Sequence, residues 1–328
     1  MSSEYVVIGG AGFIGSQFVE TLINNGKTVS VVDNFCSGTI GHLKNVLGHS
    51  RLSIKEIDVE ATTKLITATK DSRVVIHLAS NPDIAKAASE PRVDFTQGTV
   101  LTESVAEAAR INGTQKIFYA SGSGVYGDAG NTFLDENSPL NPISTYGASK
   151  LAGESILSAY SYMFGLEVVV FRFANVVGPK QTHGVGYDFI NKLKSDPTKL
   201  EILGDGKQDK SYVFVGDVVS AVLGCELLSL PFFDVFNISV NDSLTVNEIA
   251  MLAIEALNIE TGSVKLNYTG GARGWKADVP VVRLKSDKIR GTGWSPKYSS
   301  QGAMVKALKS LVGDIEALDS KLELEKNQ

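Results

Sequence analysis

The amino-acid sequence predicts an α/β fold, in which a doubly wound parallel sheet is accompanied by a smaller α+β domain. Short apolar runs rich in β-branched residues recur along the first half of the chain, and helix-length segments separate them. This alternation is typical of parallel sheets, because two parallel strands need a long crossover connection. The expected strands are Tyr5–Ile8, Thr28–Val32, Arg51–Ile57, Val74–Leu78, Lys116–Ala120 and Glu167–Phe171.

A glycine-rich turn directly follows the first expected strand, between Gly9 and Gly15, and an apolar helix pattern begins within it. Gly9 permits a tight turn, Gly12 lets the backbone approach a pyrophosphate, and Gly15 allows the helix to pack closely. The N–H groups at the start of the helix can then bind phosphate oxygens. The turn therefore indicates a Rossmann-like, dinucleotide-binding sheet.

The second expected strand ends at an acidic residue, Asp33. In dinucleotide-binding folds, a carboxylate at this distance from the glycine-rich turn accepts hydrogen bonds from the ribose hydroxyls. The 2′-phosphate of NADP would be repelled by this carboxylate. The sequence therefore predicts NAD as the cofactor.

Tyr146 and Lys150 are four residues apart, so a helix presents both on one face. Tyrosine has an ordinary pKa of about 10 and carries almost no phenolate at neutral pH. A nearby ammonium stabilises the phenolate and lowers that pKa. Lowering the pKa of Tyr146 to about 7 requires roughly 4 kcal/mol of stabilisation of the phenolate. Lys150 and a cationic nicotinamide ring could supply this in a site shielded from water. This spacing also occurs by chance, so the dinucleotide motif is what favours a catalytic pair.

The later part of the chain has a different pattern, because prolines and glycines such as Pro179 and Gly271 divide it into short elements. We therefore expect residues 1–173 to form an NAD-binding domain, to which the segment around 211–237 returns. Residues 174–328 should form mainly the substrate domain. This second domain should cover the carboxyl edge of the sheet, where doubly wound folds bind their ligands.

Composition argues against several classes of protein. A chain of 328 residues with 43% hydrophobic content can bury a large core. The net charge of −5 and the lack of a basic run argue against nucleic acid as a partner. Because the chain shows neither an apolar run of about 18 residues nor a signal-peptide pattern, we expect a cytoplasmic protein without a membrane segment. Two cysteines, Cys36 and Cys225, and no Cys/His cluster predict free thiols and no metal site.

These motifs together resemble the extended short-chain dehydrogenase/reductase superfamily, and within it the nucleotide-sugar epimerases, most of all the UDP-glucose 4-epimerases. The resemblance extends over nearly the whole chain, and it is more specific for the superfamily than for the substrate. The segments that carry it are Gly9 to Gly15, Asp33-Asn34, Asp58-Val59, His77-Leu78-Ala79, Val125-Tyr126-Gly127, Tyr146 to Lys150, Arg172-Phe173-Ala174-Asn175 and Gly204-Asp205-Gly206.

The resemblance implies a UDP-hexose 4-epimerase that keeps NAD tightly bound. Its substrates would be UDP-glucose and UDP-galactose, and could include UDP-N-acetylglucosamine and UDP-N-acetylgalactosamine. Carbon 4 of a hexose bears no acidic hydrogen, so its inversion requires transient oxidation to a ketone. Tyr146 would exchange the proton of the 4-hydroxyl, while Lys150 would tune Tyr146 and hold the nicotinamide ribose. A homodimer joined by helices, one of them carrying Tyr146, is also implied.

The same resemblance implies two sets of binding residues. Asp58 and Val59 would border the adenine, and the segment from Leu78 to Ser80 would lie on the pyrophosphate side. The expected cofactor-binding residues are Gly9, Gly12, Phe13, Ile14, Gly15, Asp33, Asn34, Asp58, Val59, Leu78, Ala79, Ser80, Tyr146 and Lys150. The expected substrate-binding residues are Asn175, Lys210, Arg273, Asp278 and Val282.

Three of these residues concern the diphosphate of the substrate. Asn175 and Lys210 would contact it, and Lys210 stands where relatives carry arginine, so it would neutralise phosphate without a bidentate fork. Relatives carry a further phosphate-binding arginine at the position of Trp275. Arg273 or Lys276 could take that role. Alternatively, Lys210 and Arg273 could be solvated surface cations.

The other two concern the ribose and the sugar. Asp278 matches an acid that binds the nucleotide ribose in relatives. Val282 lies four residues later, where relatives place a residue beside the 2-substituent of the sugar. Tyrosine there would exclude an N-acetyl group, so valine predicts room for the acetylated sugars.

One departure from the family pattern affects the catalytic hydroxyl. Relatives carry serine or threonine at the position of Gly122, where it hydrogen-bonds the reacting oxygen. We expect Ser123 to substitute, with Ser121 as the second candidate; alternatively, both serines only satisfy local backbone groups. Related dehydratases carry an Asp-Glu pair after this position, whereas this chain has Ser123-Gly124, which disfavours elimination.

Two other functions compete with epimerisation of UDP-hexoses. The first is a different NAD-dependent nucleotide-sugar modifier, either a UDP-glucuronate epimerase or an atypical dehydratase or reductase. The second is a non-catalytic sensor of NAD or sugar nucleotides. Gly122 and Gly98 raise this second alternative, because Gly98 stands where relatives carry an asparagine near the cofactor.

Overall fold

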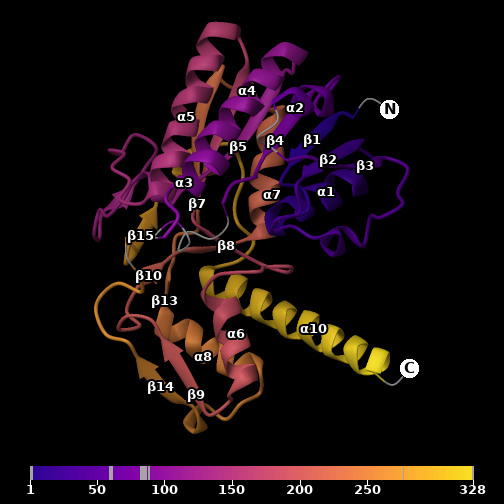
Figure 1. Ribbon diagram of the computed structural model, residues 1–328. Coiled ribbons are helices and arrows are strands. Elements are labelled where there is room, and N and C mark those ends of the chain that lie inside the picture. Colours follow the sequence, from indigo (N-terminus) through magenta and orange to yellow (C-terminus); the bar gives the residue numbers. More distant parts are fainter. Residues whose placement is uncertain (1–2, 59–61, 82–86, 88, 276, 327–328) are drawn as a thin grey trace.

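The computed structural model describes residues 3–58, 62–81, 87, 89–275 and 277–326 (Figure 1). Within these residues, seven parallel strands form the main sheet in the order β12-β7-β5-β4-β1-β2-β3, which confirms the predicted doubly wound sheet. The strands are β1 (Tyr5–Ile8), β2 (Val29–Asp33), β3 (Leu52–Glu56), β4 (Val74–His77), β5 (Lys116–Gly122), β7 (Glu167–Phe173) and β12 (Phe233–Ile238). The strand order reverses between β1 and β4, and such a reversal opens a crevice at the carboxyl edge.

Helices cover both faces of this sheet. On one face lie α1 (Phe13–Asn24) and α7 (Val215–Gly224), which contact each other. The opposite face is covered by α2 (Thr62–Ala68), α4 (Leu101–Asn112) and α5 (Thr145–Phe164), with α4 between the other two. Both faces of the sheet are therefore buried, which explains why its strands read as continuous apolar runs.

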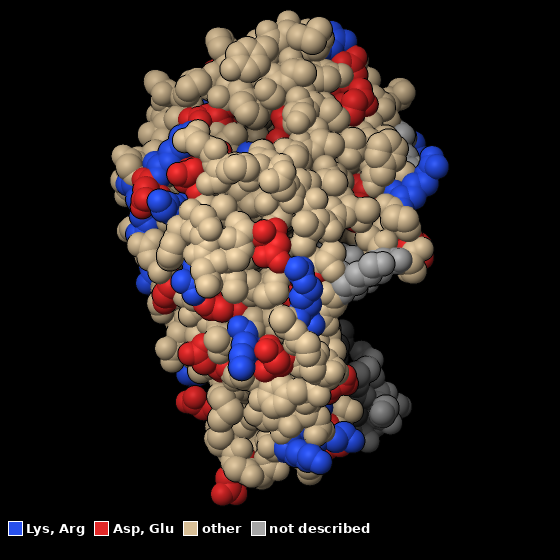
Figure 2. Space-filling view, turned by 90° about the vertical axis from the view of Figure 1, so that its left-hand side faces the viewer, with Lys and Arg blue, Asp and Glu red and all other residues tan. Residues whose placement is uncertain are grey.

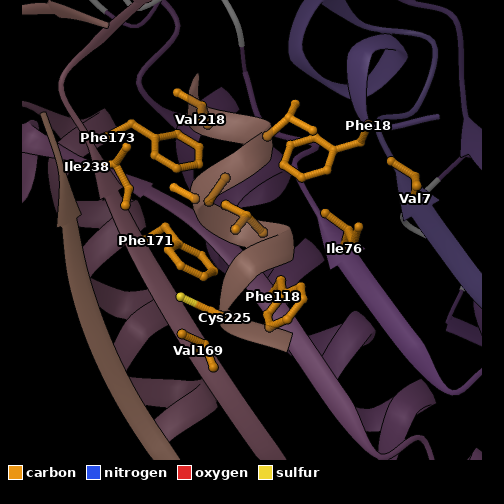
Figure 3. Packing of buried hydrophobic residues seen from close by; sticks show 14 of the residues in the cluster. Val7, Phe18, Ile76, Phe118, Val169, Phe171, Phe173, Val218, Cys225 and Ile238 are labelled. Carbon is orange, nitrogen blue, oxygen red and sulfur yellow. The ribbon is translucent and has the colours of Figure 1, made fainter. Parts of the chain in front are cut away.

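The core between the sheet and the helices α1 and α7 is rich in aromatic side chains. Phe118 of β5 and Phe171 of β7 pack edge to face, with ring centroids 5.7 Å apart. Phe18 of α1 and Cys225, which follows α7, belong to the same buried cluster (Figure 3). Alternate residues of these strands point to the other face and pack against α4 and α5.

Apart from the long helix α10, the second lobe consists of shorter elements, and most of it lies in the lower half of Figure 1. Its apolar core lies between α6, α8 and α10 and includes Phe189, Ile249 and Leu308. The helices are α6 (Val185–Ser195), α8 (Val246–Ala256) and α10 (Ser300–Lys326). The strands are β6 (Phe133–Leu134), β8 (Asn175–Val177), β9 (Lys199–Ile202), β10 (Asp209–Lys210), β11 (Tyr212–Phe214), β13 (Leu244–Thr245), β14 (Lys265–Tyr268) and β15 (Val281–Leu284).

Several short helical segments complete the description. One of them, η3, has π-helical hydrogen bonding and leads directly into α4. Insertions of this kind are frequent at functional sites. The segments are α3 (Arg92–Asp94), α9 (Asp287–Arg290), η1 (Ile40–Leu43), η3 (Phe95–Val100), η4 (Ser123–Val125), η5 (Cys225–Leu227) and η6 (Thr261–Ser263).

Helix α5 has well-defined ends, and these fix where its side chains lie. Ser144 caps the start, because its hydroxyl accepts a hydrogen bond of 3.0 Å from the Gly147 N–H. The helix ends before Gly165, whose φ of +70° is easily reached by glycine. The cap therefore places Tyr146 in the first turn and Lys150 one turn later.

A buried polar network joins α5 to three strands of the main sheet. The guanidinium of Arg172 pairs with the carboxylate of Glu154 at 2.7 Å, and both side chains are almost fully buried. The Ser121 hydroxyl also donates to Glu154, at 2.5 Å. Arg172 donates to the Tyr126 hydroxyl at 2.9 Å, which donates in turn to Asn237 at 2.8 Å. The network holds α5 against β5, β7 and β12.

Replacing Glu154 with glutamine should destabilise the protein strongly, because Arg172 would remain charged in a buried site without a counter-ion. We expect the free energy of unfolding, measured by urea denaturation, to fall by about 3 to 5 kcal/mol. The matched control is Glu107→Gln, which breaks a surface ion pair with Arg110 on α4 and should cost less than about 1 kcal/mol. Equal losses in the two variants would contradict the structural role of the buried pair.

Candidate active site

The glycine-rich turn lies where β1 ends and α1 begins. Gly9 has a φ of +81°, and a Cβ at this position would lie 2.8 Å from the Ala79 nitrogen. At Gly15 a Cβ would lie 2.0 Å from the Gly9 carbonyl oxygen, so the turn accepts only glycine there. Helix α1 starts at Phe13 without a side-chain cap. Its first N–H groups are therefore available to an anion.

Asp33 lies at the carboxyl end of β2, directly beside this turn. Its carboxylate is buried and accepts hydrogen bonds of 2.9 Å from the backbone N–H groups of Ala11 and Phe35. Each carboxylate oxygen can accept a further hydrogen bond. Asn34 follows and accepts a hydrogen bond from the Cys36 N–H. The structure thus brings Asp33 and Asn34 to the glycine-rich turn.

The segment after β4 forms the other side of this crevice. The N–H groups of Leu78 and Ala79 donate to the Ile8 carbonyl oxygen at 2.9 and 3.1 Å, which ties the segment to the end of β1. Ser80 follows and is partly buried. Asp58 is exposed beyond β3, and Val59 lies outside the described residues.

Lys150 lies between two aromatic rings beneath the first turn of α5. Its ammonium nitrogen donates to the Ala120 carbonyl oxygen at 2.8 Å. It lies 5.6 Å from the centre of the Tyr146 ring and 5.2 Å from that of Tyr119. The predicted placement of Tyr146 and Lys150 on one helical face is present, and only 3% of Lys150 is exposed.

Burial and nearby charges set the protonation of this pair. Burial raises the pKa of Tyr146 above its ordinary value, while a hydrogen bond with Ser80 lowers it and the charge of Asp94 raises it. Burial lowers the pKa of Lys150 to about 8, against the opposing charges of Glu154 and Asp94. In the protein alone, the pKa of Tyr146 is therefore raised, whereas we expected Lys150 to lower it.

The two candidate serines differ in their surroundings. Ser121 is buried in β5, and its hydroxyl donates a hydrogen bond to the Glu154 carboxylate. Ser123 begins η4 and is partly buried, and its hydroxyl has no hydrogen-bond partner among the described residues. A Cβ at Gly147 would lie 2.4 Å from the Gly124 carbonyl oxygen. The loop that carries Ser123 is therefore packed directly on the first turn of α5.

Gly122 and Gly98 depart from the family pattern, and packing requires glycine at only one of these two positions. A Cβ at Gly122 would meet its nearest neighbour, the Phe173 carbonyl oxygen, only at 3.8 Å, so packing does not require glycine there. A Cβ at Gly98 would lie 2.6 Å from the Ser149 hydroxyl oxygen, so glycine allows η3 to approach α5. Packing explains Gly98, whereas nothing in the structure explains Gly122.

Sequence reasoning missed a buried acid next to Tyr146 and Lys150. Asp94 is 1% exposed and accepts hydrogen bonds from the Asn81 amide at 2.9 Å and from the Thr145 hydroxyl at 2.7 Å. These residues come from three separate segments of the chain, and no motif connects them. Its position directly before the π-helical segment η3 is the single local signal that could have drawn attention to Asp94.

His77 belongs to one of the segments that carry the family resemblance, and the sequence alone assigns it no role. It is fully buried at the end of β4, and burial lowers the pKa of its imidazole to about 3, assisted by the charge of Lys150. The Thr102 hydroxyl donates to the Gly98 carbonyl oxygen at 2.7 Å and lies 3.1 Å from His77 Nε2. Since the hydroxyl has one proton, Nε2 must carry the proton that His77 donates. His77 is therefore a neutral structural group.

The predicted substrate-binding residues cluster in the second lobe. Lys210 of β10 pairs with Asp278 at 2.7 Å, and it lies opposite Val282 in the neighbouring strand β15. The backbone N–H of Asn175 donates to the carbonyl oxygen of Ser211, the residue that follows Lys210. The structure therefore brings Asn175, Lys210, Asp278 and Val282 together.

Arg273 joins this cluster and connects the two lobes. It donates to the Asp278 carbonyl oxygen and forms an ion pair of 2.6 Å with Asp128, which follows the η4 loop of the first lobe. Lys276, the alternative to Arg273, lies outside the described residues. The two cations of the cluster, Lys210 and Arg273, are thus each paired with an acid.

Among the described residues, no group of three or more His, Cys, Asp or Glu side chains is arranged to hold a metal ion. No helix there is long and apolar enough to cross a membrane.

The parallel sheet, the glycine-rich turn and the Tyr146 and Lys150 pair define an extended short-chain dehydrogenase/reductase. The chain belongs to the NAD dependent epimerase/dehydratase family, whose sequence profile matches residues 5–225. The cofactor of this family is NAD. The residues present fit NAD, because the glycine-rich turn leads into a helix that begins without a side-chain cap and because Asp33 borders this turn.

Individual relatives are similar over most of their length. A UDP-glucose 4-epimerase of Mycolicibacterium smegmatis is 35% identical, over 66% of this chain and 71% of that protein. A crystal structure of a UDP-galactose 4-epimerase has a TM-score of 0.84 and 35% identity, covering 94% of this chain and 99% of that one. The UDP-glucose 4-epimerase of Thermotoga maritima, solved with UDP-glucose, has a TM-score of 0.85 and 30% identity, covering 95% and 99%.

Replacing Gly147 with alanine should destabilise the protein, although alanine normally favours helices, because the added Cβ would overlap the Gly124 carbonyl group. We expect the free energy of unfolding in urea to fall by about 1 to 3 kcal/mol. Gly224→Ala is the matched control, since Gly224 is helical and its Cβ would meet no atom within 4 Å. The control should gain up to about 1 kcal/mol, and a gain in both variants would show that the loop does not press on α5.

Proposed function

We propose that the protein interconverts UDP-glucose and UDP-galactose by inverting carbon 4 of the hexose, and that it also accepts the N-acetylamino forms. The observation that carries this proposal is the buried Tyr146 and Lys150 pair beside the glycine-rich turn. The similarity to the Thermotoga maritima epimerase, which was solved with UDP-glucose, supports the same class of substrate. Because carbon 4 carries no acidic hydrogen, the reaction passes through a 4-keto sugar.

Tyr146 is the acid–base group of this reaction. Its phenolate takes the proton of the 4-hydroxyl when the sugar is oxidised, and the phenol returns it when the ketone is reduced. Bound NAD supplies the redox chemistry, first as acceptor and then as donor of one hydride. With a pKa of about 8, Lys150 is largely protonated at neutral pH and stabilises the phenolate. Both steps together leave no net oxidation.

The two lobes divide the binding of the ligands. We assign NAD to residues 1–173, together with the returning segment around 211–237, and the sugar nucleotide mainly to residues 174–328. The backbone N–H groups from Gly12 to Gly15 would bind the pyrophosphate. Asp33 would accept hydrogen bonds from the ribose. The remaining proposed cofactor contacts are those of Gly9, Phe13, Ile14, Asn34, Asp58, Val59, Leu78, Ala79 and Ser80.

The second lobe offers both charges that a nucleoside diphosphate needs. Lys210 and Arg273 would neutralise the diphosphate, and Asp278 would accept hydrogen bonds from the ribose hydroxyls. Both cations are paired with acids in the structure, so binding would exchange these ion pairs for phosphate contacts. Asn175 would contact the same diphosphate from β8.

The loop after β5 favours epimerisation over elimination. Ser123 and Gly124 stand where related dehydratases carry two carboxylates, and a dehydration lacks its acid and base without them. We propose that the Ser123 hydroxyl contacts the reacting oxygen of the sugar. Ser121 serves that role less well, because its proton is donated to Glu154.

We further propose that two copies of the chain associate through α4 and α5. The ends of these helices expose large apolar side chains, including Ile111, Tyr162 and Met163. The face in Figure 2, which views the molecule from the side of α5, carries few charged side chains in its upper part. A paired arrangement would bury these side chains.

The direct test is proton NMR of UDP-glucose incubated with the purified protein and no added NAD. We expect UDP-galactose to appear, because the cofactor stays bound and is regenerated in each turnover. Tyr146→Phe removes the acid–base group and should lower kcat about 10² to 10⁴-fold. Tyr268→Phe is the matched control, since Tyr268 is 46% exposed on β14 of the second lobe, outside both the proposed site and the proposed interface. Absence of conversion by the wild type, even with NAD supplied, would refute the proposed function.

A second prediction concerns the sugar specificity. Val282→Tyr should lower kcat/KM for UDP-N-acetylglucosamine at least about tenfold more than for UDP-glucose, because the larger ring fills the space beside the 2-substituent. Val281→Tyr is the matched control, since adjacent strand residues point to opposite faces. Strict refusal of the acetylated sugar by the wild type would show that valine does not provide the room.

A further inference from the structure

Lys180, in the loop between β8 and α6, contacts two elements of the first lobe. Its ammonium nitrogen donates to the Glu20 carboxylate of α1 at 2.5 Å and to the carbonyl oxygen of His42 in η1 at 2.6 Å. The side chains of Lys180 and Glu20 are only 13% and 17% exposed. A loop that leads into the second lobe is therefore joined to the first lobe by an ion pair that is largely shielded from solvent.

The backbone of Lys180 indicates that this contact is specific. Its φ is +66°, in the left-handed region that a lysine seldom adopts. Such a conformation persists where surrounding contacts compensate its cost. Glycine would adopt the same φ without strain, so the lysine at this position indicates that its ammonium group is needed.

The contact with His42 leads directly to the glycine-rich turn. His42 Nδ1 lies 2.8 Å from the Ala11 carbonyl oxygen and donates to it, because a carbonyl oxygen only accepts. The Thr39 N–H donates to the same oxygen at 3.1 Å. A Cβ at Gly38 would lie 2.9 Å from the Ala11 carbonyl carbon. Residues 34–45, which we call the η1 segment, therefore pack directly on the turn.

Glu20 fastens the end of the η1 segment as well. Its carboxylate accepts a hydrogen bond of 3.1 Å from the Asn45 amide, in addition to the one from Lys180. The η1 segment begins directly after Asp33, the proposed partner of the NAD ribose, and it includes Asn34. A segment that moved away from the turn would separate the proposed ribose contacts from the proposed pyrophosphate contacts.

We propose that Lys180 is a positioning residue for the cofactor, which keeps NAD bound between turnovers by holding the η1 segment against the glycine-rich turn. This inference deepens the proposed function and rests on it, because it requires NAD to lie on that turn. Retention matters in this reaction, since the hydride taken from the sugar is returned by the same cofactor molecule. Release of NAD has to break its contacts with both the turn and Asp33, and a fastened segment raises the barrier to that step.

The first test measures how fast NAD is lost. Protein loaded with radiolabelled NAD is mixed with an excess of unlabelled NAD, and the label that stays on the protein is followed by rapid filtration. Lys180→Met should lose the label at least about tenfold faster than the wild type, because two charge-assisted hydrogen bonds are removed. The matched control is Lys192→Met, which breaks an exposed ion pair with Asp188 on α6 and should leave the rate unchanged. Equal rates in the wild type and Lys180→Met would overturn the proposal.

Two further variants distinguish positioning of the cofactor from a purely structural role. Lys180→Arg keeps the cation and should restore slow loss of NAD. Lys180→Asn removes the cation but tolerates the left-handed φ, so its stability in urea should be closer to that of the wild type than the stability of Lys180→Met. Loss of NAD should nevertheless remain fast in Lys180→Asn. Retention of NAD by this variant at the wild-type level would show that the ammonium does not hold the cofactor.

The path through the η1 segment is tested by a double variant. His42→Leu removes the donor to Ala11 and leaves the carbonyl group that Lys180 binds. It should also accelerate the loss of NAD. The double variant with Lys180→Met should lose NAD no faster than the faster single variant, because both changes release the same segment. Accelerations that multiply would show that Lys180 does not act through the η1 segment.

Failure of this inference can be told apart from failure of the proposed function, because the filtration measurement needs no sugar nucleotide. A protein that holds NAD through Lys180 but converts no UDP-hexose would refute the proposed function and keep the inference. An active wild type that loses NAD no more slowly than Lys180→Met would refute the inference alone. A wild type that binds no NAD would refute both.

Discussion

The site depends on the burial of one cation, the ammonium group of Lys150. An isolated buried ammonium is costly, so the surrounding structure has to compensate it. The compensation comes from the Ala120 carbonyl oxygen at 2.8 Å, from the faces of the Tyr119 and Tyr146 rings, and from the charges of Glu154 and Asp94. These groups belong to α5, β5 and α3. The need to compensate the buried ammonium of Lys150 therefore constrains how α5, β5 and α3 pack against one another.

Stability and chemistry share the same groups on the two sides of Lys150. On the side of the sheet, Glu154 compensates both Lys150 and Arg172, so the carboxylate that holds α5 in place also maintains the ammonium. On the side of the crevice, Asp94 fixes the first turn of α5 through Thr145. Because both acids are nearly fully buried, their fields reach the pair with little screening by solvent.

Local patterns in the sequence were sufficient for most of the main sheet and for the placement of Tyr146 and Lys150. The apolar runs predicted six of the seven strands of that sheet, all except β12, and the spacing of Tyr146 and Lys150 predicted a shared helical face. Both patterns depend on near neighbours in the chain. The contacts of Asp94 with Asn81 and Thr145 could not be predicted, because they join segments that only the tertiary fold brings together. The contact of Gly98 with Ser149 is missed for the same reason.

An isotope experiment distinguishes direct hydride transfer at carbon 4, with Tyr146 as proton carrier, from exchange of that hydrogen with solvent. UDP-glucose carrying deuterium at carbon 4 is incubated with the protein in ordinary water, and the product is analysed by NMR and mass spectrometry. Retention of deuterium at carbon 4 of UDP-galactose is the predicted result, because the transferred hydride does not exchange with solvent. Replacement of the deuterium by hydrogen from water would contradict this mechanism.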